Sequence, residues 1–251
     1  MKTTLAVVLA TYNEEENISD CLKSVEELTD EIVIVDGGSK DKTVEIAKSY
    51  GAHVIETDNP QIFHINKNKA IKAATKDWIL QLDADERVSK ELASEIENVI
   101  NKDSDINGFW IPRSNFFLGR FLKKGGQYPD YTLRLYKRGK GRLPAKDVHE
   151  QALVEGNVGY LKNDLLHLRD KSFKKYLDGL DKYTSIMAIH MKNDKLSKNL
   201  INLVNYLLIK PIWWFLKTYI RHKGFMDSWQ GFVFSFFSSI RFSIAYIKYI
   251  L

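Results

Sequence analysis

The first hundred residues alternate between short apolar runs and segments with helical periodicity. Ile18, Cys21 and Leu22, for example, fall on one helix face at i, i+3 and i+4. The apolar runs predict strands at residues 5–10, 31–36, 53–56 and 78–82. The periodic segments predict helices at residues 14–28, 42–50, 66–74 and 89–100, the first capped by Asn13 and the last by Ser89. Strands alternating with helices indicate a mostly parallel sheet with helices on both faces.

The pattern changes after about residue 106. Short strands separated by glycine-rich or basic loops are expected at residues 109–111, 132–136 and 151–154, and helices again after Lys171. We therefore expect one α/β domain over residues 1–170, with halves at 1–105 and 106–170, followed by a helical C-terminal region over residues 171–251.

The net charge of +5 conceals an asymmetry between these two regions. Residues 171–251 carry 13 Lys and Arg against 4 Asp and no Glu, whereas residues 1–170 hold 24 basic and 28 acidic side chains. The C-terminal region is also rich in aromatic residues. A basic, aromatic surface suits nucleic acid or an anionic membrane. The apolar residues are too many and too clustered for a nucleic-acid-binding face, so we expect a membrane partner and no nucleic acid.

Two apolar segments of this region could cross or lie on a membrane. Residues 200–220 contain Lys210 and Lys217, and residues 229–251 contain Arg241. Neither is a clean run of about 20 apolar residues, and a mid-segment Arg costs roughly 2.5–3.5 kcal/mol on insertion scales. We therefore favour amphipathic helices at the interface and a peripheral protein. A membrane span, a re-entrant hairpin and an oligomer interface are the alternatives.

The cysteine content and the N-terminus bear on the compartment. The single cysteine, Cys21, excludes an intramolecular disulfide, which fits a reducing compartment. The first apolar run leads into residues 11–14 (Thr-Tyr-Asn-Glu) rather than into a signal-peptide cleavage site. We expect a protein on the cytoplasmic side of the membrane.

The most informative polar residues are Asp83 and Asp85, which follow the apolar run at residues 78–82. Ala84 between them lets the backbone bend, so both carboxylates can face one pocket. Like charges held this close need a cation, and oxygen ligands suit a hard divalent ion such as Mg²⁺ or Mn²⁺. Such a metal would hold a diphosphate. Surface turns also produce this spacing, so the pair alone does not establish the site.

Three segments that each follow a predicted strand resemble the motifs of a known protein family. Residues 10–15, 35–41 and 82–86 each follow a predicted strand and together resemble glycosyltransferase family 2 members with the GT-A fold. Residues 126–130, 133–135 and 148–150 resemble the branch of that family that includes lipopolysaccharide-core β-glucosyltransferases.

The resemblance implies an inverting glycosyltransferase. It would move a hexose from a nucleotide-sugar donor, UDP-glucose or a related UDP-hexose, to a lipid-linked or lipopolysaccharide-core acceptor at the cytoplasmic face of the inner or plasma membrane. A polyprenyl-phosphate acceptor and a catalytically inactive GT-A membrane scaffold are the alternatives. A nucleotidyltransferase fits less well, because residues 11–14 are not the glycine-rich, basic loop that such enzymes usually place after the first strand.

The resemblance also assigns residues to the donor. Asp36 would accept from the base, Gly38 would allow a close backbone approach, and Asp83 and Asp85 would bind the metal, with Asp83 also reaching the ribose. The remaining donor-site residues are Thr11, Tyr12, Glu14, Lys67, Asn68, Arg134 and His149. Structural roles compete with several of these assignments. Asp36 could cap a turn, Glu14 could complement a helix dipole, and the residues at 67–68 could lie on a solvated helix face.

A base must also take the proton of the acceptor hydroxyl. Glu150 is the preferred candidate and Asp130 the second, since both lie in the acceptor-side half. A structural ion pair, for example with Arg134, is the alternative for either carboxylate. We interpret His149 as an orienting or packed histidine and His167 as structural, outside the site.

Overall fold

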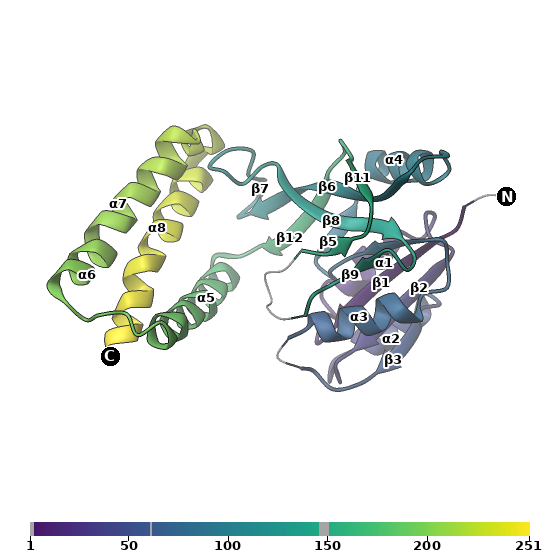
Figure 1. Cartoon of the computed structure of the whole chain (residues 1–251), viewed down its shortest axis with the longest axis horizontal. Helices are drawn as coiled ribbons and strands as arrows, with labels where there is room; N and C mark the ends of the chain where they lie inside the picture. Colours follow the sequence, from purple (N-terminus) through teal and green to yellow (C-terminus); the bar gives the residue numbers. More distant parts are fainter. Residues whose placement is uncertain (1–2, 61, 146–150) are drawn as a thin grey trace. The chain divides into compact units, whose positions relative to one another are not determined.

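The computed structural model of the chain describes residues 3–60, 62–145 and 151–251 and contains two units (Figure 1). The sheet unit comprises Met1–Arg113 and Asp130–His167. The helical unit comprises Ser114–Pro129 and Leu168–Leu251.

Four parallel strands form the first half of the sheet unit. They are β1 (Leu5–Thr11), β2 (Glu31–Asp36), β3 (His53–Glu56) and β4 (Trp78–Gln81), in the order β3-β2-β1-β4. Because the strands are parallel, the loops that follow β1, β2 and β4 all leave from the same edge of the sheet.

The strand β1 is apolar from Leu5 to Ala10 because helices cover both faces of the sheet. Leu5, Val7 and Leu9 pack into one core with α1 (Ile18–Lys23), α2 (Thr43–Ser49) and α4 (Lys90–Ile100). Ala6 and Val8 point to the opposite face and pack against α3 (His64–Ala73). This alternation gives a three-layer arrangement.

Further strands extend the sheet beyond β4. They are β8 (Asp130–Lys137), β6 (Ile106–Phe117), β12 (Leu165–Asp170) and β5 (Glu86–Val88), in the order β4-β8-β6-β12-β5. The strand β8 is antiparallel to both β4 and β6. Shorter strands pair at the margins: β11 (Asn157–Tyr160) and β7 (Arg120–Phe121) with β6, and β9 (Gly141–Arg142) with β10 (Leu153–Val154).

An irregularity between β6 and β8 is important for the site. Phe109 pairs with Leu135 and the next residue, Trp110, pairs with Leu133. Arg134 is therefore the extra residue of a β-bulge. Bulges redirect a side chain relative to the regular alternation of a strand, and here the redirected side chain is a buried arginine.

The helical unit contains a long helix pair and a third helix. Residues 200–221 form one helical segment built from α6 (Leu200–Val204), η1 (Asn205–Ile209), α7 (Lys210–Phe215) and η2 (Leu216–Arg221). The short η3 (Gly224–Asp227) leads into α8 (Ser228–Ile250), and α5 (Phe173–Asn193) also packs on α8. No helix in the described part of the chain is both long and apolar enough to cross a membrane.

The structure confirms most predicted elements, changes one helix and adds several short strands that were not predicted. Ser89 caps α4, its Oγ accepting from Leu92 N at 3.1 Å. The helix expected at residues 14–28 is wrong in extent, because turns replace both of its ends and only α1 remains. Asn13 is not its cap: the residue has φ 54° and its Oδ1 accepts from Lys40 N. The strand β5 was not predicted, because its three residues include two charges, Glu86 and Arg87, that are buried here.

The packing of the β9–β10 hairpin gives a stability prediction. A Cβ added at Gly141 would lie 2.3 Å from Tyr136 Cδ2, within a buried ring, whereas a Cβ at Gly179 in α5 meets nothing within 4 Å. Gly141→Ala should therefore destabilise the fold by about 1–3 kcal/mol. Gly179→Ala should stabilise it by about 0.5–1 kcal/mol, because alanine restricts the unfolded chain. Urea unfolding of both variants tests this, and equal midpoints would contradict it.

Candidate active site

The loops after β1 and β2 are joined by side-chain hydrogen bonds. Asn13 N donates to Ser39 Oγ at 2.8 Å, and Asn13 Oδ1 accepts from Lys40 N at 2.9 Å. Glu14 N donates to Thr43 Oγ1 at 2.7 Å. The two predicted donor-binding segments therefore form one surface at the carboxyl edge of the parallel strands.

Asp36 is fully buried at the end of β2 and holds its own turn. Its Oδ1 accepts from Ser39 N at 2.9 Å and its Oδ2 from Ser39 Oγ at 2.6 Å. Gly38 in this turn has φ 80°, a conformation that favours glycine. The capping role is thus present in the structure. A carboxylate has about four acceptor positions, so capping leaves room for a nucleobase donor.

Three predicted residues lie at the end of β1. Thr11 is buried, and its Oγ1 has no hydrogen-bond partner among the described residues. Tyr12 is 43% exposed, so its ring can pack on a ligand. Glu14 Oε2 accepts from Asn17 Nδ2 at 2.9 Å. A buried hydroxyl without a partner costs free energy, and a bound ligand could satisfy it.

Asp83 is held between two buried cations. Lys67 Nζ lies 2.5 Å from Asp83 Oδ1, and Arg134 Nη2 lies 2.6 Å from Asp83 Oδ2. Burial alone would raise the pKa of the Asp83 carboxyl, but Arg134 and Lys67 hold that pKa well below its usual range. Burial conversely lowers the pKa of Lys67, and Asp83 opposes this shift. Asp83 is therefore ionised at neutral pH.

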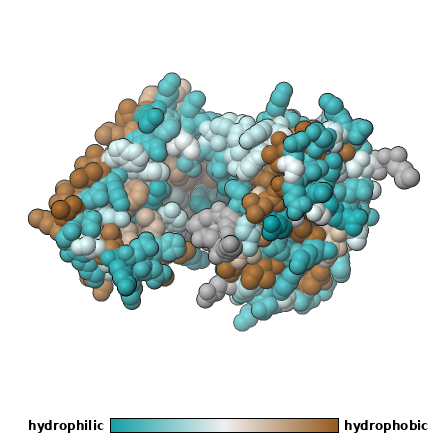
Figure 2. Space-filling view, in the orientation of Figure 1, coloured by the Kyte–Doolittle hydropathy of each residue, from teal (hydrophilic) through white to brown (hydrophobic). Residues whose placement is uncertain are grey.

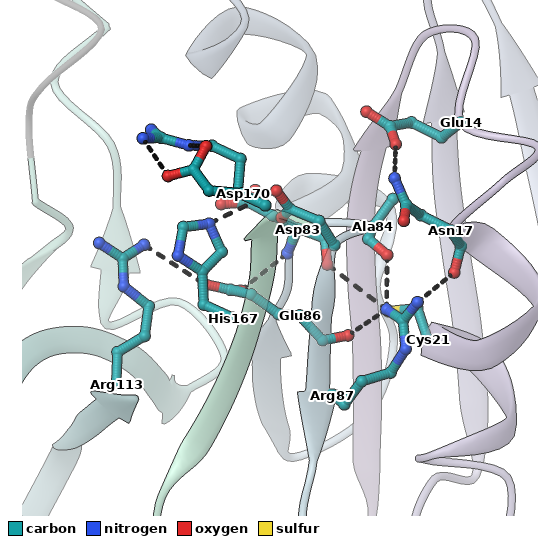
Figure 3. Close-up of polar contacts among 12 residues, drawn as sticks. Glu14, Asn17, Cys21, Asp83, Ala84, Glu86, Arg87, Arg113, His167 and Asp170 are labelled. Carbon is teal, nitrogen blue, oxygen red and sulfur yellow. Dashed lines mark hydrogen bonds and ion pairs between the residues drawn. The ribbon is translucent and has the colours of Figure 1, made fainter. Parts of the chain in front are cut away.

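Glu86, three residues on, lies beside both Asp83 and Arg113 (Figure 3). It is fully buried. Its Oε2 accepts from Asp83 N at 2.9 Å, and its Oε1 lies 3.0 Å from Arg134 Nη2 and 3.5 Å from Arg113 Nη1. We did not predict Glu86 as a site residue. Its place directly after Asp83 and Asp85, at the end of an apolar run, is the only indication in the sequence.

Arg113 in turn binds Asp130, the second candidate for the base. The two residues face each other in register across β6 and β8. Arg113 Nη2 and Nε donate to Asp130 Oδ2 at 2.7 and 3.0 Å. The carboxylate thus takes part in a structural ion pair, the alternative role that the sequence left open, although with Arg113 rather than Arg134.

Asp85 has a different partner from Asp83. Its Oδ2 lies 3.4 Å from Nε2 of His167, which β12 places opposite Glu86 in the pairing with β5. From the sequence we expect His167 to be structural and outside the site, whereas the structure places it beside Asp85. A carboxylate oxygen and an imidazole nitrogen at this distance can bind one divalent ion. The described residues contain no cluster of three or more His, Cys, Asp or Glu side chains suited to a metal.

Arg87 stabilises the turn between β4 and β5 through hydrogen bonds to backbone carbonyls. Its Nη1 donates to the carbonyls of Ala84 at 2.7 Å and Glu86 at 2.8 Å, and its Nη2 donates to Asn17 O at 2.8 Å (Figure 3). The arginine therefore joins the acidic turn to the start of α1. The nearby Cys21 is buried, which raises the pKa of its thiol, so it is not a nucleophile.

Asn68 is not brought into this group. Asn68 uses its amide on the backbone of Leu143, donating to the carbonyl at 2.9 Å and accepting from N–H at 3.0 Å. His149 and Glu150 lie outside the described residues.

Comparisons with known proteins agree with this arrangement. The family model described as Glycosyl transferase family 2 matches residues 6–163. The chain is 28% identical over 257 residues to the "Lipopolysaccharide core biosynthesis glycosyltransferase LpsC" of Rhizobium meliloti, covering 96% of this chain and 92% of that protein. It is 29% identical over 241 residues to an uncharacterized glycosyltransferase of Rickettsia typhi, covering 91% and 80% of the two chains.

Two solved structures have a similar fold. The mannosyltransferase PcManGT from Pyrobaculum calidifontis, solved in complex with GDP-Man and Mn²⁺, superposes with a TM-score of 0.58 at 12% identity and covers 100% of this chain and 88% of its own. Residues 1–349 of S. aureus TarS superpose with a TM-score of 0.50 at 16% identity, covering 98% and 88%. These likenesses support the predicted GT-A architecture, with a sheet that continues past its parallel strands and a helical C-terminal region.

The ion pairs of Asp83 give a pH prediction. Because folding lowers its pKa, ionised Asp83 contributes stability that is present above its unfolded pKa of about 3.9. That contribution is lost as the pH falls toward the lower folded value. Asp83→Asn leaves Lys67 and Arg134 without their shared counter-charge. This substitution should lower the free energy of unfolding by about 3 kcal/mol at pH 7. It should also make the free energy of unfolding fall less steeply as the pH is lowered. Urea unfolding at several pH values measures both effects.

The control for this experiment is Asp103→Asn, which alters an exposed carboxylate. If both variants show the same pH profile as the unmodified protein, the stabilising role of the Asp83 ion pairs is wrong.

Proposed function

The chain belongs to glycosyltransferase family 2 and is a glycosyltransferase, and from this we propose that it transfers a hexose from a UDP-hexose to a lipid-linked or lipopolysaccharide-core acceptor, with inversion. The observation that carries the proposal is the charged turn after β4, where Asp83 and Asp85 each meet their own partners. The similarity to LpsC supports the acceptor class. An intact charged turn argues against an inactive scaffold.

In this proposal the nucleoside lies over the joined loops of β1 and β2. Asp36 accepts from the base, Tyr12 packs on the base or ribose, and the buried Thr11 hydroxyl gains a partner. Lys67 and Arg134 are the buried cations at the neighbouring strand end, where the diphosphate charge would fall. Asp83 keeps both cations at this edge and can reach the ribose.

The residues present fit a divalent metal. Asp83 uses both oxygens on cations, so we assign the metal to Asp85 together with His167 rather than to the two aspartates. One carboxylate and one imidazole leave the other positions for substrate phosphates and water, which is common for such ions. When bound, the ion supplies Lewis-acid stabilisation of the departing nucleoside diphosphate. The Mn²⁺ in the PcManGT complex supports this class of cofactor.

We assign the base to Glu150. Its carboxylate takes the proton of the acceptor hydroxyl as the oxygen attacks the anomeric carbon from the face opposite the leaving group. Asp130 is the weaker candidate because Arg113 already binds its carboxylate.

The helical unit supports a position at the membrane surface. Many large apolar side chains of α6, α7 and their π-helical continuations are exposed, among them Ile201 at 76%, Ile212 at 57% and Trp213 at 55%. Figure 2 shows hydrophobic residues gathered over α6 and α7. We propose that this unit holds the enzyme peripherally at the cytoplasmic face, close to a lipid-linked acceptor.

The metal assignment predicts matched losses at Asp85 and His167. Asp85→Ala and His167→Ala should each lower turnover by at least about 10²-fold, because the leaving group loses its Lewis acid. Electron paramagnetic resonance of Mn²⁺ in the presence of UDP should show weakened binding in both variants. Asp103→Asn is the control. Normal Mn²⁺ binding by His167→Ala would remove this histidine from the site, and full turnover in excess chelator would refute the metal itself.

The base assignment predicts a loss of rate without loss of donor binding. Glu150→Gln removes the proton acceptor and keeps the shape, so kcat should fall by about 10²–10⁴-fold while UDP-hexose affinity persists. Isothermal titration and steady-state kinetics separate the two effects. If Glu150→Gln turns over normally and Asp130→Asn does not, the base is Asp130.

A further inference from the structure

Two segments far apart in the sequence meet at one end of the helical unit. Lys123 N and Lys124 N, in the loop after β7, donate to Asp227 Oδ1 at 3.2 Å and to Asp227 Oδ2 at 2.7 Å. Gly125 N donates to the carbonyl of His222 at 2.9 Å. The segment at residues 118–126, which includes β7, therefore lies against the turn between η2 and α8.

This contact concentrates positive charge. Lys123 and Lys124 come from the first segment and Arg221 and Lys223 from the second, and all four residues are exposed. Arg120, with a side chain 41% exposed, donates to Ser228 Oγ at 2.9 Å. The only acid within residues 118–126 and 220–230 is Asp227, which is 2% exposed, accepts two backbone N–H groups and has its Oδ1 3.9 Å from Arg120 Nε. The surface is therefore strongly basic.

Apolar side chains project from the same turn. Phe225, Met226 and Trp229 are 50%, 52% and 58% exposed. The preceding helical segment exposes an apolar side chain at every fourth position up to this turn: Leu208, Ile212, Leu216 and Ile220. Phe225 and Phe232 both contact the ring of Tyr219, so the apolar side chains of η3 and α8 adjoin that segment.

We propose that this basic tip (Arg120, Lys123, Lys124, Arg221 and Lys223, around Phe225, Met226 and Trp229) binds the phosphate headgroups of an anionic phospholipid bilayer. The cations contact headgroup phosphates while the aromatic and methionine side chains enter the headgroup–acyl boundary. A bilayer suits the tip because it offers negative charge and apolar depth together. A second copy of the chain would bring five like charges against five others. The proposal rests on the peripheral membrane position proposed above and names the site that produces it.

The test uses the full-length protein and sedimentation with two kinds of vesicle, phosphatidylcholine alone and phosphatidylcholine mixed with phosphatidylglycerol. Lys124→Gln combined with Lys223→Gln removes one charge from each segment and should lower partitioning onto the anionic vesicles roughly 25-fold. The matched control, Arg138→Gln with Lys140→Gln, removes two exposed charges from the turn after β8 in the sheet unit. It should change partitioning by less than about twofold.

Two further arms separate the sources of binding. Trp229→Ala should weaken binding to both vesicle types, because the free energy of inserting an apolar side chain into the bilayer does not depend on the charge of the lipid. Inorganic phosphate should compete no better than sodium chloride of equal ionic strength. Stronger competition by phosphate would mean that the tip binds free phosphate groups and would overturn the bilayer assignment.

Equal losses from the Lys124/Lys223 and Arg138/Lys140 pairs would also overturn the proposal, since net charge rather than the tip would then determine binding. Nucleoside diphosphate release with a soluble acceptor distinguishes this failure from failure of the proposed function. The Lys124→Gln, Lys223→Gln variant should retain that activity.

Discussion

The neutralisation of Asp83 is the interaction on which the site depends. A carboxylate at the end of a buried strand is costly unless cations match it. Lys67 from α3 and Arg134 from β8 each bind one of its oxygens, and both cations are themselves buried. Each member of the group is stable there only because the others are present. The parallel half of the sheet and its antiparallel extension are therefore joined electrostatically at the edge where a substrate would bind.

The bulge in β8 is the backbone feature that places Arg134 beside Asp83 and Glu86. Without the extra residue, regular alternation would direct position 134 differently, and Asp83 and Glu86 would lose a shared guanidinium. Glu86 extends the balance through Arg113 to Asp130. A continuous network of ion pairs thus runs from the predicted donor side of the site to the predicted acceptor side, so a substitution on one side should alter the strength of the ion pairs on the other.

The helical unit follows a different physical principle. Its helices pack aromatic side chains against one another, as between Tyr206 and the buried Tyr246, yet leave many large apolar side chains exposed. A soluble surface rarely exposes so much apolar area without a partner. Some of the basic residues beside this apolar surface, Lys123 and Lys124, belong to the loop between β7 and β8. Their backbone N–H groups bind Asp227, so segments before and after β8 in the sequence form one end of the unit.

Hydrophobic periodicity and strand-end polarity are local properties, so the parallel strands, the helices around them and the acidic turn after β4 are predictable from the sequence. The family resemblance added the donor-binding segments. Which charged side chains pair with one another depends on the folded structure. His167 reaches Asp85 through the pairing of β12 with β5, and Arg134 reaches Asp83 through a bulge. Asn68 instead binds the backbone of Leu143. Such long-range pairings depend on strand order and register, which local sequence patterns do not encode.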